Sequence, residues 1–275
     1  MNCAADRSYG LLKSGTPNTT RPTRTRLPNS ALRPRISGDK MLETEILYGR
    51  NPVVEAASAG RKIHRIWLTD KTAKALKKSL SNHLDLVEIV TKEEIGKITG
   101  KRDHQGAAAE TEPFVYADFE AISAIARGVV IAEEGVTDPR NLGAIIRSAV
   151  LLGAKGVIIP SKNSAQITPV VCHTSAGATE HIAIAKTESL PHSLKLLKSK
   201  GFTIAGATVP NEKSTAINEY IPPEKTVLIL GSEWKGLSRK IESICDILLC
   251  IPQKTDFDSF NVSVAASILL WELIR

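Results

Sequence analysis

Two hydrophobic patterns follow one another along the chain. Between residues 51 and 99, short apolar runs alternate with polar, lysine-containing helical segments, which predicts a small α/β unit. Asn51 is expected to cap the first helix, with Pro52 in its first turn, and Thr91 with Glu94 three residues later has capping-box spacing. The expected elements are a helix over 51–60, a strand over 63–69, a helix over 71–82, a strand over 85–90 and a helix that begins at Thr91.

From residue 128 onward, continuous runs of β-branched residues and leucine alternate with amphipathic helices. Runs without polar alternation predict strands buried on both faces, and therefore a mostly parallel sheet with helices on either side. The expected strands are VVIAEE, GVIIP, HIAIA, FTIAGA, TVLILGS and ILLCIP, and the expected helices are 139–152, a short one after Thr168, 190–200 and 262–274. Ligands bind such sheets at the carboxyl ends of the strands, which here are the loops after Glu134, Pro160, Thr208, Gly231 and Pro252.

These patterns predict a chain in four parts. Residues 1–40 form a disordered basic leader, 41–106 a small α/β domain, 107–127 a linker with a first helix, and 128–275 the larger α/β domain. The leader is rich in Thr, Pro and Arg, and Met41 stands just before the first structured segment. It is consistent with a start at Met41, with a basic arm that tracks RNA, or with an organelle transit peptide.

Composition and charge narrow the class of protein. Of 275 residues, 42% are hydrophobic and 24% are charged, which excludes collagen-like, coiled-coil and wholly disordered chains. No apolar run approaches the ~20 residues that a membrane span needs. The net charge of +7 lies almost entirely in the leader (8 basic, 2 acidic), and the other 235 residues carry 28 basic and 27 acidic side chains. Bulk charge therefore does not establish nucleic-acid binding.

Neither the cysteines nor the basic cluster after the leader indicates a specific functional site. Four cysteines without a CxxC pair indicate reduced thiols in a cytoplasm-like compartment, and Cys172-His173 lacks the second ligand pair that a metal site needs. The densest basic cluster after the leader, Arg61 to Arg65, fits either a phosphate contact or a solvated face.

No GxGxxG, GxxxxGK[ST], HExxH or GxSxG motif is present, but three other segments carry a specific pattern. The first is DPRNLGAIIRS (138–148), in which Asp138 caps a helix; Gly143, one turn before Arg147, is expected to leave space for a substrate. The second is LGSEWKGL (230–237), a strand end with a glycine-bounded turn. The third is IP at 251–252, followed past a polar loop by SFNVSVA (259–265), where Asn261 can cap the last helix.

In this order the three segments resemble the motifs of the SpoU (TrmH-type) branch of the SPOUT RNA 2′-O-ribose methyltransferases. Residues 46–105, with LYGRNPVVEAASAGRKIHRIWLT and DHQG, resemble the ribosomal-protein-L30e-like substrate-binding domain of the large-subunit rRNA guanosine-2′-O-methyltransferase subgroup. The resemblance covers about 230 residues and implies an α/β knot, in which the C-terminal segment threads a loop to form the cofactor pocket.

The resemblance also implies a function and its residues. It implies methyl transfer from S-adenosyl-L-methionine, without a metal, to the ribose 2′-hydroxyl of a guanosine in 23S ribosomal RNA, with transfer RNA as the nearest alternative substrate. The cofactor-binding positions implied are Gly231, Ile251 and Phe260, through their main chain, and the catalytic positions are Arg147, Asn141, Glu233, Asn261 and Ser263. Since a guanidinium is not deprotonated in proteins, Arg147 is expected to bind phosphate and stabilise the developing alkoxide.

The last helix is apolar nearly all round, so it needs cover on two sides. One side is expected to face its own sheet and the other a second subunit, which makes the protein a homodimer through this helix. A deeply buried helix within one chain is the alternative. A non-catalytic RNA-binding ribosome-assembly factor remains the alternative to an enzyme, and an organelle remains the alternative to the cytoplasm if residues 1–40 are a transit peptide.

Overall fold

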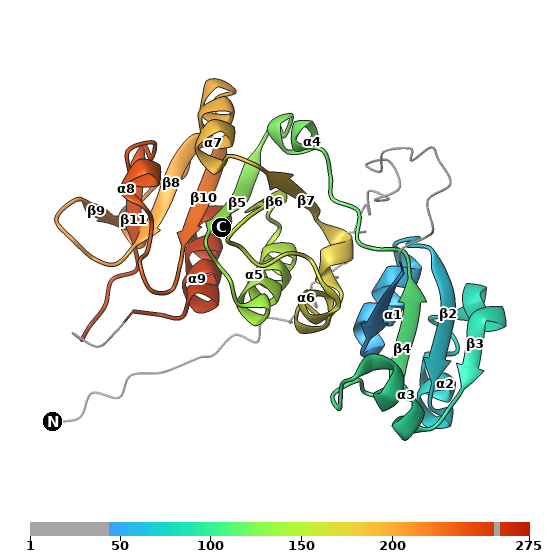
Figure 1. Cartoon of the computed structure of the whole chain (residues 1–275). Coiled ribbons are helices and arrows are strands. Elements are labelled where there is room, and N and C mark those ends of the chain that lie inside the picture. Colours follow the sequence, from blue (N-terminus) through green and yellow to red (C-terminus); the bar gives the residue numbers. More distant parts are fainter. Residues whose placement is uncertain (1–43, 256–258) are drawn as a thin grey trace, which may run out of the picture.

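The computed structural model describes residues 44–255 and 259–275 and contains two β-sheets, each with its own helices (Figure 1). The expectations for residues 1–40, including the leader and the start at Met41, lie outside the described residues. Among the described residues, no helix is long and apolar enough to cross a membrane.

The first sheet has four strands in the order β1-β4-β2-β3, in which only the β2–β3 pair is parallel. Helices α1 and α2 cover one face through a core that includes Val53 and Leu80, and α3 covers the other through Ile95. The elements are β1 (Glu45–Tyr48), α1 (Arg50–Ser58), β2 (Ile63–Leu68), α2 (Asp70–Leu76), β3 (Val87–Ile89), α3 (Lys92–Thr99) and β4 (Ala107–Thr111).

Three local expectations are corrected here. Residues 107–111, assigned to the linker, form β4, which pairs with both β1 and β2. Helix α1 begins at Arg50 after Gly49, so Asn51 is not its cap, and the Arg50 N–H donates to the Gln105 side chain instead. Helix α2 ends at Leu76, six residues earlier than expected.

The second sheet has seven strands, all parallel, in the order β7-β6-β5-β10-β8-β11-β9. The expected mostly parallel α/β sheet is confirmed. Its strands are β5 (Gly128–Glu134), β6 (Gly156–Pro160), β7 (Ala183–Thr187), β8 (Thr203–Thr208), β9 (Ser214–Ala216), β10 (Lys225–Gly231) and β11 (Ile247–Cys250). Its helices are α4 (Phe119–Ser123), α5 (Pro139–Leu152), α6 (Pro169–Thr174), α7 (Leu190–Ser199), α8 (Arg239–Glu242) and α9 (Val262–Ile274).

Successive residues of β5 show why these strands lack polar alternation. Ile131 packs into the core shared with α5, α6 and α9, whereas Val130 packs into the core shared with α4, α7 and α8. Both faces of the strand are therefore buried, as continuous β-branched runs require.

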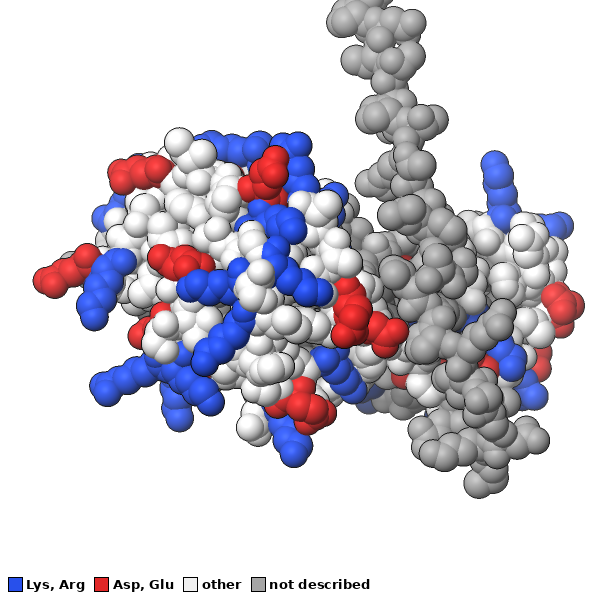
Figure 2. Space-filling view, turned by 90° about the horizontal axis from the view of Figure 1, so that it is seen from above, with Lys and Arg blue, Asp and Glu red and all other residues white. Residues whose placement is uncertain are grey.

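Lys and Arg side chains are spread over the outer face seen in Figure 2, with Asp and Glu between them, rather than gathered into one basic patch.

The two caps predicted for the second domain are present. Asp138 accepts a hydrogen bond from Arg140 N at the start of α5, and Asn261 accepts one from Ser263 N at the start of α9. The expectation for Gly143 is wrong: a Cβ at this position would lie 2.0 Å from the Thr174 hydroxyl oxygen. The glycine lets α5 pack closely against α6 and opens no space for a substrate.

The two sheets share part of one core. Leu47 of β1 and Ala56 of α1 are buried in the same cluster as Cys172 of α6 and Ile182, which follows the short 3₁₀ helix η3 (Ala178–His181). The small domain therefore packs directly on α6 and η3, as Figure 1 shows at the right of the larger sheet. The threading of the C-terminal segment that the resemblance implies stays a prediction.

Candidate active site

A wide groove lies at the carboxyl edge of the parallel sheet, where the loops after three strands meet. It is lined by the segments 207–211, 230–237, 250–253 and 259–262, among others. Gly231, Ile251 and Phe260, the three expected cofactor-binding residues, all line it, together with Glu233 and Asn261. The groove thus lies where open parallel sheets bind their ligands.

The loop after β10 closes back on itself directly above Gly231. Ser232 N donates to Gly236 O at 3.2 Å, and Gly236 N donates to Ser232 O at 3.0 Å. A Cβ on Gly231 would lie 2.3 Å from the Gly236 carbonyl carbon, so no other residue fits here without opening the turn. This turn holds Glu233 at the rim of the groove.

Four of the predicted catalytic side chains form one hydrogen-bonded chain, called here the site network. Asn141 Nδ2 donates to Glu233 Oε1 at 2.7 Å, and Asn261 Nδ2 donates to Asn141 Oδ1 at 3.2 Å. The Asn261 oxygen in turn accepts from Ser263 N and Oγ, at 2.9 and 2.7 Å. Residues 120 positions apart are thereby joined through uncharged amides to a single exposed carboxylate.

Two consecutive carboxylates at the end of β5 hold the loops around this network. Glu134 lies opposite Gly231 in the sheet register and accepts from Ser238 N and Oγ, at 2.9 and 2.7 Å, which anchors the far end of the Glu233 loop. Glu133 is fully buried on the other side and accepts from Val136 N at 2.8 Å and from the Ser164 hydroxyl. Burial raises the pKa of Glu133 to about 7.

Sequence reasoning missed the roles of Glu133 and Glu134. The one available signal was the position of Glu133 within an otherwise apolar strand, because a carboxyl in a doubly covered strand needs internal partners.

Arg147 is not part of the site network. It is exposed on α5, six residues after Asn141, which places it about 120° away around the helix axis. Arg147 does not line the groove. Leu151, one turn further along the same helix face, is also exposed.

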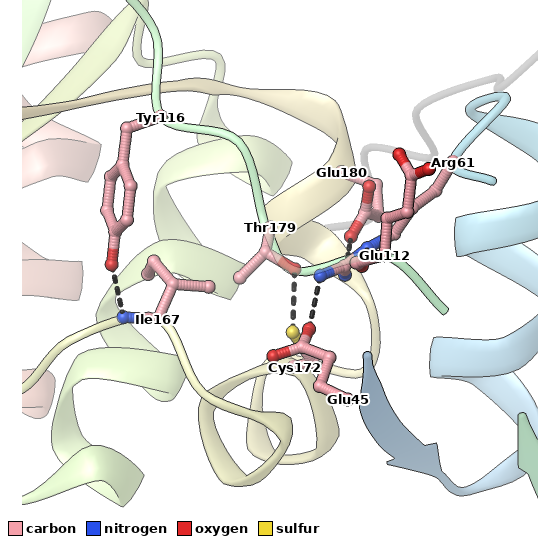
Figure 3. Close-up of polar contacts among 8 residues, drawn as sticks. All are labelled: Glu45, Arg61, Glu112, Tyr116, Ile167, Cys172, Thr179 and Glu180. Carbon is pink, nitrogen blue, oxygen red and sulfur yellow. Dashed lines mark hydrogen bonds and ion pairs between the residues drawn. The ribbon is translucent and has the colours of Figure 1, made fainter. Parts of the chain in front are cut away.

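A second polar cluster lies between the two domains and is called here the interface cluster: Glu45, Arg61 and Glu180 (Figure 3). Arg61 is 3% exposed, donates to Glu180 at 2.9 Å and forms an ion pair with Glu45 of β1. Burial alone would lower the pKa of Arg61, but the two carboxylates outweigh it and raise that pKa further. Arg61 is therefore committed to the domain interface.

The rest of the predicted basic cluster is also largely neutralised. Lys62 pairs with Glu112 at 3.1 Å, and Arg65 pairs with Glu88 at 3.2 Å. Both basic side chains are exposed, with Lys62 at 58% and Arg65 at 53%, so the phosphate contact considered from the sequence stays a prediction for these two residues.

Cys172 and His173 belong to the same interface. Burial raises the pKa of the Cys172 thiol to about 11, so the sulfur stays protonated and inert. The His173 ring stacks on Tyr48 at 4.5 Å between centroids, and its Nε2 lies 3.3 Å from a carboxylate oxygen of Asp103. Within residues 44–255 and 259–275, no group of three His, Cys, Asp or Glu side chains could hold a metal ion.

The fold and the groove define an α/β protein with a ligand site at the carboxyl edge of a parallel sheet. Comparison with known proteins identifies the family. The model of the SpoU rRNA Methylase family matches residues 128–271, and the model of RNA 2′-O ribose methyltransferase substrate binding matches residues 46–117. The chain belongs to the SpoU rRNA methylase family and is an RNA methyltransferase of the SpoU/TrmH type, which confirms the resemblance.

Individual relatives agree with this family. The "Uncharacterized tRNA/rRNA methyltransferase" of Mycobacterium avium (strain 104) is 32% identical over 252 residues, which cover 88% of this chain and 81% of that protein. An AdoMet-bound rRNA methyltransferase from Sinorhizobium meliloti has a similar fold, with a TM-score of 0.70, 23% identity and coverage of 84% and 86%. The SpoU methyltransferase AviRb from Streptomyces viridochromogenes also has a TM-score of 0.70, with 21% identity and coverage of 84% and 89%.

Proposed function

We propose that this RNA methyltransferase transfers a methyl group from S-adenosyl-L-methionine to the ribose 2′-hydroxyl of a guanosine in large-subunit (23S) ribosomal RNA. The observation that carries the proposal is the site network, in which the Glu233 carboxylate and the Asn261 amide line the groove and the Asn141 amide hydrogen-bonds to both. Carboxylate and amide oxygens can accept a hydrogen bond from a ribose hydroxyl, and amide N–H groups can donate to a base or sugar oxygen.

The groove fits the proposed cofactor by its chemistry. Buried Leu230 and Leu269 provide an apolar floor for a flat ring, and the backbone groups of Gly231, Ile251 and Phe260 lie around it. When bound, S-adenosyl-L-methionine supplies an electrophilic methyl group together with its leaving group. The carboxylate of Glu233 at the same rim favours a sulfonium cation nearby.

The protein residues then have distinct roles. Glu233, held by Asn141, orients the attacking hydroxyl, and Asn261 keeps Asn141 in place while it caps α9. Ser263 fixes the Asn261 amide. Arg147 binds a phosphate of the RNA and stabilises the developing alkoxide, since this arginine is exposed and has no carboxylate partner among the described residues.

We further propose that two copies of the chain associate through α9 and α5. Val264 and Trp271 are exposed one heptad apart on α9, and Leu151 is exposed on the neighbouring α5. A second copy over these residues would supply the missing cover of the apolar last helix and place Arg147 near the subunit boundary. Sedimentation of wild type and Trp271→Glu tests this: a dimer that becomes a monomer supports it, and a monomeric wild type overturns it.

The function is tested by methyl incorporation from labelled S-adenosyl-L-methionine into unmodified large-subunit ribosomal RNA and bulk transfer RNA, with the modified sites then mapped. Arg147→Ala is expected to remove incorporation, and Arg127→Ala, an exposed arginine at the opposite edge of the sheet, is the matched control. Label in transfer RNA alone would overturn the ribosomal target. If the protein binds the cofactor and RNA but transfers no methyl group to ribosomal RNA or to transfer RNA, a non-catalytic ribosome-assembly factor is favoured.

A further inference from the structure

Trp234 is the most exposed large apolar side chain of the described residues, at 94%. It stands between Glu233 and Lys235 in the closed turn after β10, and it lines the groove. An indole this exposed buries almost no surface within its own chain, so it contributes little to folding. Because Trp234 is both exposed and next to the site network, we expect it to contact a ligand.

A second aromatic ring lies at the same groove. Phe260 is 44% exposed and directly precedes Asn261 of the site network. The exposed aromatic side chains in the described part of the chain are Trp234, Phe260 and Trp271, and the first two line this groove. Aromatic rings therefore lie on the two groove-lining segments that carry residues of the site network, 230–237 and 259–262.

The charge of the groove restricts which part of an RNA can enter it. The charged residues of its described lining are Glu219, Glu233 and Glu242 against Lys235. A phosphate backbone along this surface would be repelled by three carboxylates and attracted by one ammonium group. A nucleotide is therefore expected to enter with its uncharged base and ribose first, and an uncharged contact such as ring stacking must hold it.

We propose that Trp234 stacks on a nucleobase of the RNA at the methylated position, so that the substrate class is RNA with an unpaired nucleotide there. The inference rests on the proposed function. A base inside a helix is covered on both sides by its neighbours and cannot take the indole, whereas a loop nucleotide or an extruded one can. Trp234 is thus a specificity-determining residue, and Glu233 beside it receives the ribose.

The first test is tryptophan fluorescence of the full chain. The three tryptophans are Trp67, Trp234 and Trp271, and Trp67 is buried and donates to Glu88. Trp271→Phe leaves Trp234 as the exposed indole. An RNA fragment that carries the mapped site in a single-stranded loop is expected to quench it, and S-adenosyl-L-methionine alone is not. Quenching by the cofactor alone, or none with saturating RNA, overturns the proposal.

The second test is kinetic and uses Trp234→Leu, which keeps an apolar side chain, and Trp234→Phe, which keeps a ring. The Leu variant is expected to raise the KM for RNA about tenfold or more with little change in kcat, and the Phe variant to recover most of the loss. Ile221→Ala is the control, since Ile221 is 89% exposed and does not line the groove. Wild type is expected to prefer the loop RNA to the same sequence in a duplex.

The outcomes separate the two proposals. If wild type methylates no RNA, the proposed function fails whatever the Trp234 variants do. If wild type methylates RNA but the KM of Trp234→Leu is unchanged, or the duplex is the better substrate, only the stacking proposal fails. Unchanged cofactor affinity in both variants excludes damage to the groove as the cause of a raised KM.

Discussion

The interface cluster and the site network are both polar groups assembled from distant parts of the chain, yet they are built in opposite ways. The interface cluster joins full charges, with the buried Arg61 between the half-buried Glu45 and the buried Glu180. The site network is at the surface and joins neutral amides to one carboxylate, Glu233. The difference separates two tasks: buried charges hold the domains in one orientation, and exposed amides leave hydrogen-bonding capacity for a ligand.

The largest effect is expected from breaking the interface cluster. Arg61→Met removes the buried guanidinium that pairs with Glu180 and Glu45, and should lower the free energy of unfolding by about 3–5 kcal/mol. Urea unfolding measures this. Arg65→Met, which removes an arginine from an exposed pair with Glu88, is the control and should cost less than ~1 kcal/mol. If both variants lose the same free energy of unfolding, the buried ion pairs stabilise the protein no more than the exposed pair does, which contradicts the prediction.

The site network should respond in activity and not in stability. Asn141→Ala removes the donor that holds Glu233 and should lower kcat/KM for methyl transfer about 100-fold, with a stability change below ~1 kcal/mol. Steady-state kinetics and urea unfolding of the same preparation check both halves. Asn218→Ala, at an exposed asparagine that does not line the groove, should leave both values unchanged.

Glu133 combines features of both regions, because it is a buried carboxyl that supports the site loops. Its folded pKa of about 7 lies above the ordinary glutamate value of 4.5, so the folded state binds this proton more tightly than the unfolded state does. Stability from this group is therefore fully present below pH 4.5 and is lost as pH rises to 7.

Glu133→Gln imitates the protonated form. It should remove this pH dependence and raise the free energy of unfolding at pH 8 by about 3 kcal/mol. Unfolding measured between pH 5 and 8 tests it, with the exposed Glu188→Gln as control. If the free energy of unfolding of Glu133→Gln still falls with rising pH as steeply as that of wild type, Glu133 is not the source of this pH dependence.

The smallest effect is expected at a second cross-domain ion pair. His181 and Glu55 lie 2.6 Å apart, but both side chains are about 30% exposed (27% and 31%). His181→Gln should therefore cost less than ~1 kcal/mol. A loss comparable to that of Arg61→Met would mean that burial does not distinguish the interface cluster after all.

Much of the larger domain could be predicted from local sequence. The strands β5 and β10 are continuous apolar runs, and the caps Asp138 and Asn261 have their expected hydrogen bonds. In the small domain, β4 was missed because AAAET has low β-propensity. It is a strand since small side chains suit a segment paired on both edges and covered on both faces.

The site could be predicted only in part. Motif order brought Asn141, Glu233 and Asn261 together, although their spacing along the chain does not encode proximity. Helix geometry alone turns Arg147 about 120° away from Asn141 around α5. Gly143, expected to admit a substrate, packs on α6. Glu180, one of the two carboxylate partners of Arg61, lies 119 residues away, and no local pattern signals such a contact.

The site network has a consequence for the order of events during synthesis. Asn141 and Glu233 can emerge and fold with the sheet, but the network remains open until Asn261 and Ser263 have been added. A nascent chain arrested before residue 261 would carry the RNA-binding domain and most of the catalytic sheet, yet lack the last support of its reaction centre. If this network is the reaction centre, as proposed, it is complete only in molecules translated past residue 263, and we expect chains truncated before that residue to transfer no methyl group.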